Sequence, residues 1–178
     1  MQGLRLIPLT DISQDIATFL SFSLAEQFEV PCRIIQAEID VARYYNIERC
    51  QYHSTEILRD LLPLAGEHDD HLLGIIDADL YIPILTFVFG EAQLGKRCAL
   101  MSAYRLYQEF YGLPTDAALL LQRCEKEAVH ELGHTLGLTH CRNFECVMHY
   151  SHSVEYIDLK RSVFCPDCSR LAGLRSRW

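Results

Sequence analysis

The sequence lacks several features that would place the chain in a membrane or on a nucleic acid. None of its segments has the ~18 consecutive apolar residues that a membrane-spanning helix requires. Its 178 residues include 16 lysines and arginines against 24 aspartates and glutamates, for a formal net charge of −8. This shortage of positive charge disfavours bulk binding to phosphate backbones or acidic lipid surfaces. We therefore expect neither a nucleic acid nor a membrane as a partner.

The first residues also lack the charged start, apolar centre and small-residue cleavage site of a signal peptide. We therefore expect no pro-segment and a cytoplasmic location. In a reducing cytoplasm, metal binding explains the 8 cysteines better than disulfides do. We interpret Cys32 and Cys98, in predicted strands, as small buried hydrophobic residues. Cys50 and His53 form a C-x-x-H pair without a partner pair, and we assign it no role.

The composition and length suit one soluble globular domain, with 49% hydrophobic and 22% charged residues. Strands separated by helices, then a hairpin and a long helix, predict an α/β fold with a mixed sheet. The predicted strands cover residues 4–9, 32–39, 72–76, 87–92 and 98–104. The predicted helices cover about 11–28 (capped by Asp11 or Ser13), 54–62, a long stretch capped by Thr115, and 157–174 with an interruption near Pro166.

The most informative segment is an H-E-x-x-H-x-x-G-x-x-H motif that begins at His130. Residues four apart share a helix face, so His130 and His134 can point at one metal ion, while Glu131 can reach a water on that ion. Gly137 can adopt a positive φ and end the helix, which would bring His140 back as a third ligand. Three imidazoles with an open fourth position are typical of a catalytic zinc site. The alternative is an amphipathic helix with solvated histidines.

A second cluster follows at once, in which four cysteines have the spacing C-x4-C-x18-C-x2-C. Paired thiolates separated by a longer loop are typical of a closed, tetrahedral, structural zinc site. The alternatives are two disulfides, which need an oxidising compartment, or a redox C-x-x-C, which usually follows a strand. We therefore predict that a second zinc is held by Cys141, Cys146, Cys165 and Cys168.

Met148 lies between the two cysteine pairs, in a predicted turn shortly after the histidines. A methionine in this position is typical of a Met-turn, an apolar floor beneath the metal site, although an ordinary core methionine is the alternative. Tyr150 could approach the zinc and stabilise an oxyanion, or it could simply be packed. We interpret the ligand-rich segment 67–71 as a solvated loop and the basic C-terminal segment as solvated surface.

In the run from His130 to His140, in Met148 and in the four interleaved cysteines, the chain resembles the archaemetzincins, small metzincin-clan zinc proteins. The resemblance implies a single metzincin-like catalytic domain over 1–178, compact, with a twisted mixed sheet and a long active-site helix. The upper subdomain would cover 1–137, and a small lower subdomain, 138–178, would contain the Met-turn and the four-cysteine site. It also implies a catalytic zinc on the histidines, with Glu131 as general base, and a second zinc on the cysteines.

We therefore predict a zinc metallopeptidase that hydrolyses peptide bonds and contains two Zn²⁺ per chain, one catalytic and one structural. Glu131 would take a proton from the attacking water and pass it to the leaving amine. The alternative is a non-hydrolytic zinc- or peptide-binding protein on the same scaffold. Retention of Glu131 argues against it, since three histidines suffice to bind zinc. We expect the protein to act as a monomer.

The substrate is predicted to be a peptide or protein that binds along a sheet edge. The hairpin strand at 87–92 would be an exposed edge next to the active site, and such an edge can pair with an extended peptide by strand addition. This is how a metzincin is expected to hold its substrate. The alternative, which we weigh equally, is an edge with a purely structural role.

Overall fold

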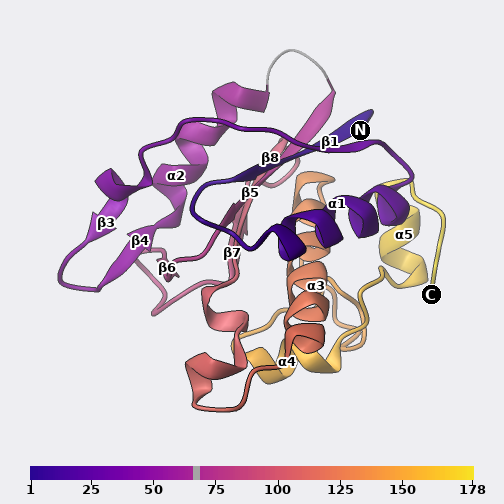
Figure 1. The fold of residues 1–178 in the computed structure, drawn as a ribbon. Helices are drawn as coiled ribbons and strands as arrows, with labels where there is room; N and C mark the ends of the chain where they lie inside the picture. Colours follow the sequence, from indigo (N-terminus) through magenta and orange to yellow (C-terminus); the bar gives the residue numbers. More distant parts are fainter. Residues whose placement is uncertain (66–68) are drawn as a thin grey trace.

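The large β-sheet of the molecule is mixed, as predicted. The computed structural model describes residues 1–65 and 69–178, and within them a five-stranded sheet has the order β2-β1-β5-β8-β7 (Figure 1). These strands are β1 (Gly3–Pro8), β2 (Cys32–Ile34), β5 (Asp70–Ile76), β7 (Gly90–Ala92) and β8 (Cys98–Ser102). The first four in spatial order are parallel, whereas β7 pairs antiparallel with β8 and forms one edge.

A smaller sheet, which the sequence analysis did not predict, lies beside the first. Its strands are β3 (Tyr45–Asn46), β4 (Gln51–His53) and β6 (Leu80–Tyr81), in the order β3-β4-β6. Strands this short are too brief to show a period of alternating hydrophobic residues. Short 3-10 helices also connect the elements: η1 (Val41–Tyr44), η2 (Leu62–Ala65), η3 (Tyr104–Leu106) and η4 (Gln108–Tyr111).

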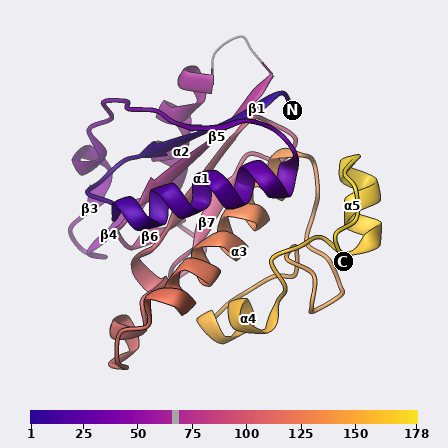
Figure 2. The ribbon, with the colours of Figure 1, turned by 45° about the vertical axis from the view of Figure 1, so that its right-hand side comes forward.

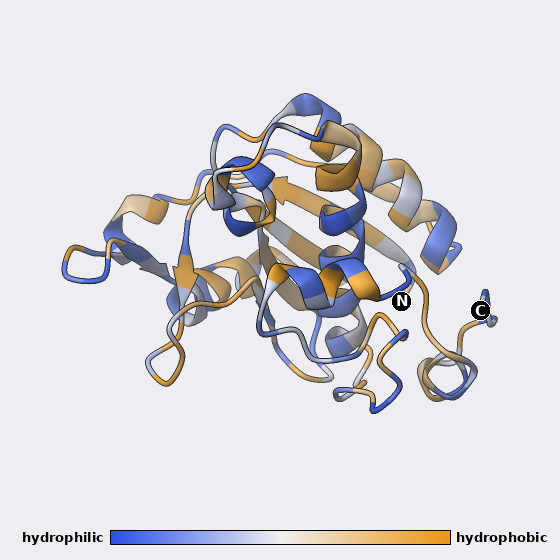
Figure 3. Cartoon of the chain, turned by 90° about the horizontal axis from the view of Figure 1, so that it is seen from below, coloured by the Kyte–Doolittle hydropathy of each residue, from blue (hydrophilic) through white to orange (hydrophobic). Residues whose placement is uncertain are grey.

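Helices cover both faces of the large sheet. On β5, Leu73 and Ile75 pack in a core with α1 (Gln14–Phe28) and α3 (Ala117–Thr135), whereas Leu72 and Ile76 pack on the other face with α2 (Ser54–Leu61). This alternation follows from the two-residue period of a strand. Figure 3 shows the strands of the sheet as predominantly hydrophobic segments between the helices. The resulting three layers place α3 across one face of the sheet, close to β7 and β8.

The first residues of the two long helices are fixed by side-chain caps. Ser13, one of the two caps proposed from the sequence, accepts a hydrogen bond from the Asp15 amide at the start of α1. At the start of α3, Asp116 accepts one from the Leu119 amide at 2.9 Å. The prediction that Thr115 caps this helix is therefore wrong by one residue. The aspartate carboxylate occupies the cap position and Thr115 hydrogen-bonds Glu109 instead.

Two predicted elements are shorter than expected. The strand predicted at 32–39 extends only over β2, because beyond Ile34 the chain leaves the edge of β1 after one more hydrogen bond, from the Ile35 amide to Leu6. The helix predicted at 157–174 is two helices, α4 (Val154–Leu159) and α5 (Pro166–Ala172). Pro166 begins α5, where its missing N–H costs no helical hydrogen bond. Helix α5 lies on the side of the molecule away from β3-β4-β6, whereas α4 lies near the lower end of α3 (Figure 2).

The prediction of a solvated loop at 67–71 is wrong for Asp70 and His71, which are the first two residues of β5. His71 is 8% exposed, and its Nδ1 donates a hydrogen bond to the Thr135 hydroxyl at 2.7 Å. Asp69 is exposed, whereas Glu67 and His68 lie outside the described residues. Cys98 is buried as predicted, and Cys32 is half-buried. In the described part of the chain, none of the helices has the length and hydropathy needed to cross a bilayer.

Candidate active site

Three histidine side chains converge at the C-terminal end of α3. His130 and His134 are one turn apart on the helix, and their Nε2 atoms lie 3.2 Å from each other. The His140 ring lies 5.3 Å from the His130 ring and 5.0 Å from the His134 ring. One ligand atom from each of the three side chains lies within 4.8 Å of the others. The structure therefore brings together all three predicted ligands of the first metal site.

The turn at Gly137 directs His140 back to the helix. Gly137 has φ +86°, a conformation that glycine adopts readily and that other residues rarely do. Its amide donates to the His134 carbonyl at 2.9 Å, and the Leu138 amide donates to the Gly133 carbonyl at 3.1 Å. These two bonds form a Schellman motif, which ends α3 and reverses the chain. The glycine of the motif thus has the role that its spacing predicted.

Hydrogen bonds to backbone carbonyls orient the first two histidine rings. His130 Nδ1 donates to the Val147 carbonyl and His134 Nδ1 donates to the Leu138 carbonyl, both at 2.7 Å. Because the proton lies on Nδ1, the Nε2 lone pairs are free and face each other. Burial lowers the pKa of His130 well below its usual value and also lowers the pKa of His134 and His140. Three neutral imidazoles with converging lone pairs fit a zinc ion.

Glu131 lies beside the histidines, between α3 and the edge strand β7. It is 4% exposed, and its Oε2 is buried without a hydrogen-bond partner among the described residues. Gly90 of β7 makes room for it, because a Cβ at that position would lie 2.6 Å from Glu131 Cγ. Burial, and next the charge of Glu127, raise the pKa of Glu131 well above its usual value. A buried carboxylate oxygen without a hydrogen-bond partner fits a position next to a metal ion or its water.

Met148 packs directly against the helix that holds the histidines. It is fully buried, and a Cβ on Gly133 would collide with its Sδ. Gly133 lies between His130 and His134 in sequence, so the methionine side chain contacts the helix at the metal site. The turn around it is closed by a bond from the His149 amide to the Cys146 carbonyl at 2.9 Å. This geometry is that of an apolar floor beneath the three histidines.

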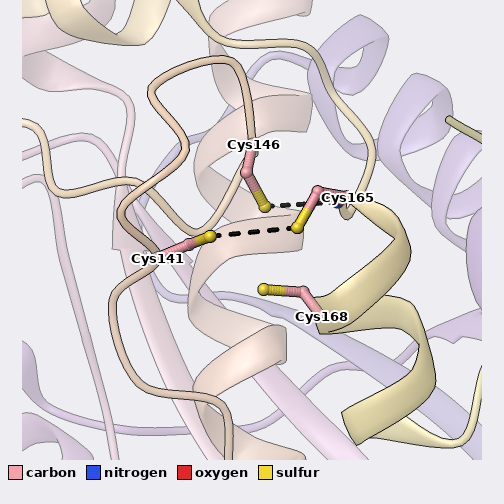
Figure 4. A group of neighbouring side chains, drawn as sticks. All are labelled: Cys141, Cys146, Cys165 and Cys168. Atoms are coloured by element: carbon pink, nitrogen blue, oxygen red, sulfur yellow. Dashed lines mark hydrogen bonds between the residues drawn. The ribbon is translucent and has the colours of Figure 1, made fainter.

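The four cysteines form a second cluster, in which the thiols point toward a common centre (Figure 4). Cys141 and Cys165 have their Sγ atoms 3.8 Å apart, and the Cys165 amide donates to Cys146 Sγ at 3.3 Å. Cys168 completes the group from the first turn of α5. All four are free thiols whose Sγ atoms lie within 4.8 Å of one another. Four sulfur donors around one point fit a tetrahedral zinc site.

A cleft of about 440 Å³ opens over the histidines. One wall is β7 with the segment 82–89 before it, and the other includes Tyr150 and His152. The strand predicted at 87–92 is confirmed only over Gly90–Ala92, but it is a sheet edge beside the cleft, as expected. Tyr150 is 45% exposed and its ring lies 5.2 Å from that of His140.

Two further charged residues, Glu127 and Lys160, also line this cleft, and the sequence analysis missed both. Glu127 precedes Glu131 by one helical turn, so its spacing would have placed it on the same face of α3. Lys160 follows α4, far from the motif in sequence, and no local pattern marks it.

The sequence matches the model of peptidase family M54 over residues 10–173. The chain belongs to peptidase family M54. It is 43% identical to an archaemetzincin of Methanocaldococcus jannaschii over 162 residues, which cover 90% of this chain and 87% of the relative. It is 36% identical to an archaemetzincin of Pyrococcus abyssi over 178 residues, 96% of this chain and 94% of the relative.

Two solved structures of similar proteins have the same fold. The crystal structure of an archaemetzincin from Archaeoglobus fulgidus, complexed with malonate, matches with a TM-score of 0.83 at 36% identity, covering 96% of this chain and 99% of the other. A zinc-dependent peptidase from Methanocorpusculum labreanum matches with a TM-score of 0.85 at 28% identity, covering 96% and 100%. The archaemetzincin resemblance and the mixed α/β fold are thus confirmed, and the M54 protein described here is a zinc metallopeptidase.

Proposed function

We propose that this M54 peptidase hydrolyses peptide bonds with Glu131 as general base, and that each chain contains one catalytic and one structural zinc. The observation that carries the proposal is the convergence of the three histidines, within 4.8 Å, in a cleft that also contains the buried carboxyl group of Glu131. The catalytic zinc would be held by His130, His134 and His140. The structural zinc would be held by Cys141, Cys146, Cys165 and Cys168.

The side chains of the cleft have separate roles in the reaction. When bound, zinc supplies a Lewis acid that polarises the scissile carbonyl and lowers the pKa of a water molecule. Glu131 accepts the proton of the attacking water and transfers it to the nitrogen of the leaving amine. The bonds to the Val147 and Leu138 carbonyls keep two histidine rings in the orientation that presents Nε2. Tyr150 is placed beside His140, where its hydroxyl could reach a developing oxyanion.

The substrate would be a peptide or protein segment in extended conformation, bound along β7. Within the described residues, β7 pairs with β8 on one side and Gly90, Glu91 and Ala92 line the cleft on the other. An edge strand offers unpaired N–H and C=O groups, with which a peptide backbone can form a further strand. The scissile bond would then lie over Glu131 and the histidines. We propose that the protein acts as a monomer in the cytoplasm.

Hydrolysis is tested by incubating a mixed peptide library with the wild-type protein and with Glu131→Gln. Both proteins are expected to contain two zinc ions by elemental analysis, and only the wild type should yield cleavage products. Glutamine keeps the size of the side chain but cannot accept the proton, so a loss of several orders of magnitude is expected. If both proteins bound peptides and neither cleaved them, the non-hydrolytic alternative would replace the proposal.

A further inference from the structure

The wall of the cleft that precedes β7, residues 82–89, is almost entirely apolar. Its sequence is Ile-Pro-Ile-Leu-Thr-Phe-Val-Phe, with one polar side chain and no charged one. Ile84 is 86% exposed and Leu85 is 37% exposed at the end of this wall. Apolar side chains that gather in one exposed segment next to a cleft are typical of a binding surface. We call residues 82–89 the apolar wall.

Side chains at the start of the small sheet fix the backbone of the apolar wall. Arg49 donates from Nη2 to the carbonyls of Leu85 and Thr86, at 2.8 Å and 3.0 Å. Gln51, which is 5% exposed, donates from Nε2 to the same Thr86 carbonyl at 2.9 Å and to Asp79 Oδ2 at 3.1 Å. The wall is therefore held by hydrogen bonds from outside the cleft, and its shape does not depend on a bound ligand.

Arg105 supports the ring of Phe87 within this wall. Its guanidinium carbon lies 4.1 Å from the centre of the ring, a distance at which a cation is attracted to the ring face. Two hydrogen bonds to the carboxylate of Asp79, both 2.6 Å, fix the plane of the guanidinium as well as its position. Phe87 lines the cleft, whereas Arg105 is not among the described residues that do. The guanidinium therefore supports the ring from outside the cleft.

The aromatic rings of the wall suit an apolar ligand. The Phe87 and Phe89 rings meet edge to face, with their centres 5.1 Å apart, and both residues line the cleft. A ligand side chain that covers them gains free energy in proportion to the apolar area removed from water. A charged side chain in the same place would lose its hydration, and the wall has no charge to compensate it.

We propose that the apolar wall is a subsite for a bulky apolar side chain of the substrate, and that Arg105, paired with Asp79, is a positioning residue that holds Phe87 against that side chain. The proposal rests on the peptidase function proposed above and names its substrate class, extended peptides with leucine, methionine or an aromatic residue near the scissile bond. The wall leads directly into β7, along which the peptide backbone would pair. Arg105 touches neither metal nor substrate in this role.

The test uses acetylated and amidated hexa-alanine peptides in which one alanine at a time is replaced by leucine, phenylalanine, lysine or glutamate. At one position of the peptide, leucine should raise the wild-type kcat/KM at least about tenfold over alanine. Lysine and glutamate at that position should give no gain. Calorimetry with zinc-loaded Glu131→Gln should show the same order of affinities, because the wall acts on binding.

Three variants locate this preference in the wall. Phe87→Ala should bring the leucine and alanine peptides to nearly equal kcat/KM, whereas Phe87→Leu, which keeps an apolar side chain, should retain most of the preference. Arg105→Met keeps the length of the side chain but loses the ion pair and the contact with the ring. It should reduce the leucine-to-alanine ratio by about 3–10-fold through a raised KM for the leucine peptide, with kcat and zinc content unchanged.

Phe110→Ala is the matched control for the loss of a ring next to Arg105. Its ring lies 4.9 Å from the same guanidinium, but Phe110 is not among the described residues that line the cleft. The leucine-to-alanine ratio of this variant should equal that of the wild type. A ratio as low as that of Arg105→Met would show that Arg105 does not act through Phe87.

Other results would also overturn the proposal. A leucine preference that survives in Phe87→Ala would show that the wall does not select the substrate, and a gain from lysine or glutamate would assign it another class of ligand. A purely structural role of Arg105 would lower the Tm of Arg105→Met and leave the ratio unchanged. If the wild type hydrolyses none of the peptides, the proposed function fails, yet their affinities for the zinc-loaded wild type still test the subsite. Equal affinities for all peptides would reject the subsite alone.

Discussion

His130 Nδ1 donates a 2.7 Å hydrogen bond to the carbonyl of Val147, the residue directly after Cys146. The first histidine of one cluster is thus oriented by the backbone next to a cysteine of the other. A second link is covalent, because His140 is followed by Cys141, whose amide donates to the Met148 carbonyl at 2.9 Å. The positions of two of the three histidines, and of the methionine beneath them, therefore depend on the position of the cysteine cluster.

Removal of one cysteine ligand should therefore weaken metal binding at the histidines. Cys168→Ser removes the thiol in α5, far along the chain from the histidine motif. We expect zinc to fall from two ions per chain to fewer than one after dialysis, since second-shell changes reduce metal affinity about 10–100-fold. Cys32→Ser, outside both clusters, should keep two. A Cys168→Ser protein that retained one ion, lost on further mutation of His134, would show that the two clusters are independent.

The turn after α3 gives a second prediction, with an internal control for backbone strain. Gly137 and Gly112 have φ of +86° and +73°, and a Cβ at either would contact nothing within 4 Å. Substitution by alanine should destabilise the protein by about 1–2 kcal/mol in both cases, because the left-handed conformation disfavours a Cβ. Only Gly137→Ala should also lose zinc from the histidines, because it alone directs His140. Equal zinc contents in the two variants, measured by elemental analysis, would contradict this account.

The sequence predicted the site better than the fold, and the reason is physical. His130, His134 and Gly137 are related by the geometry of one helix and its end, so their spacing determines how they lie. The spacing of the four cysteines is typical of a structural zinc site, and they too converge. Local geometry and the chemistry of the donors were sufficient for both clusters.

The parts that sequence did not predict depend on contacts between distant segments. Lys160 reaches the cleft only because the chain after α4 returns to α3, and the short strands of β3-β4-β6 are defined by pairing with each other. His71 was assigned to a solvated loop because the segment 67–71 lies between a predicted helix and a predicted strand. Its burial follows from β5 entering the sheet at Asp70, next to the last turn of α3. No local pattern contains that information.

The fit between β7 and the proposed base gives a third prediction. Gly90→Ala adds a Cβ that would lie 2.6 Å from Glu131 Cγ and 2.8 Å from its Cδ, so the carboxyl group has to move. We expect kcat to fall by about 10–100-fold while zinc content is unchanged. Gly112→Ala, outside the cleft, adds a methyl group that contacts nothing within 4 Å; although its positive φ of +73° makes the substitution strained, it should keep wild-type kcat. Normal turnover by Gly90→Ala would mean that the position of Glu131 matters less than proposed.

His71 makes the stability of the fold depend on pH. Burial lowers its pKa from 6.5 to about 4, and its Nδ1 must donate to Thr135 because that hydroxyl already donates to the Leu132 carbonyl at 2.6 Å. The folded state therefore keeps His71 neutral, while the unfolded state binds a proton below pH 6.5. Between pH 4 and 6.5 the unfolded state holds more protons, so the stability due to His71 is present above pH 6.5 and is lost as the pH falls through this range.

His71→Gln isolates this contribution from that of the other buried histidines. At pH 7 the variant should be less stable than the wild type, because the bond to Thr135 is altered. At pH 5 the difference in unfolding free energy should shrink by about 1–2 kcal/mol, since only the wild type has to keep this imidazole unprotonated. Urea unfolding of both proteins at the two pH values measures the change. A difference that stayed constant from pH 7 to pH 5 would show that His71 titrates alike in both states, which burial against α3 should prevent.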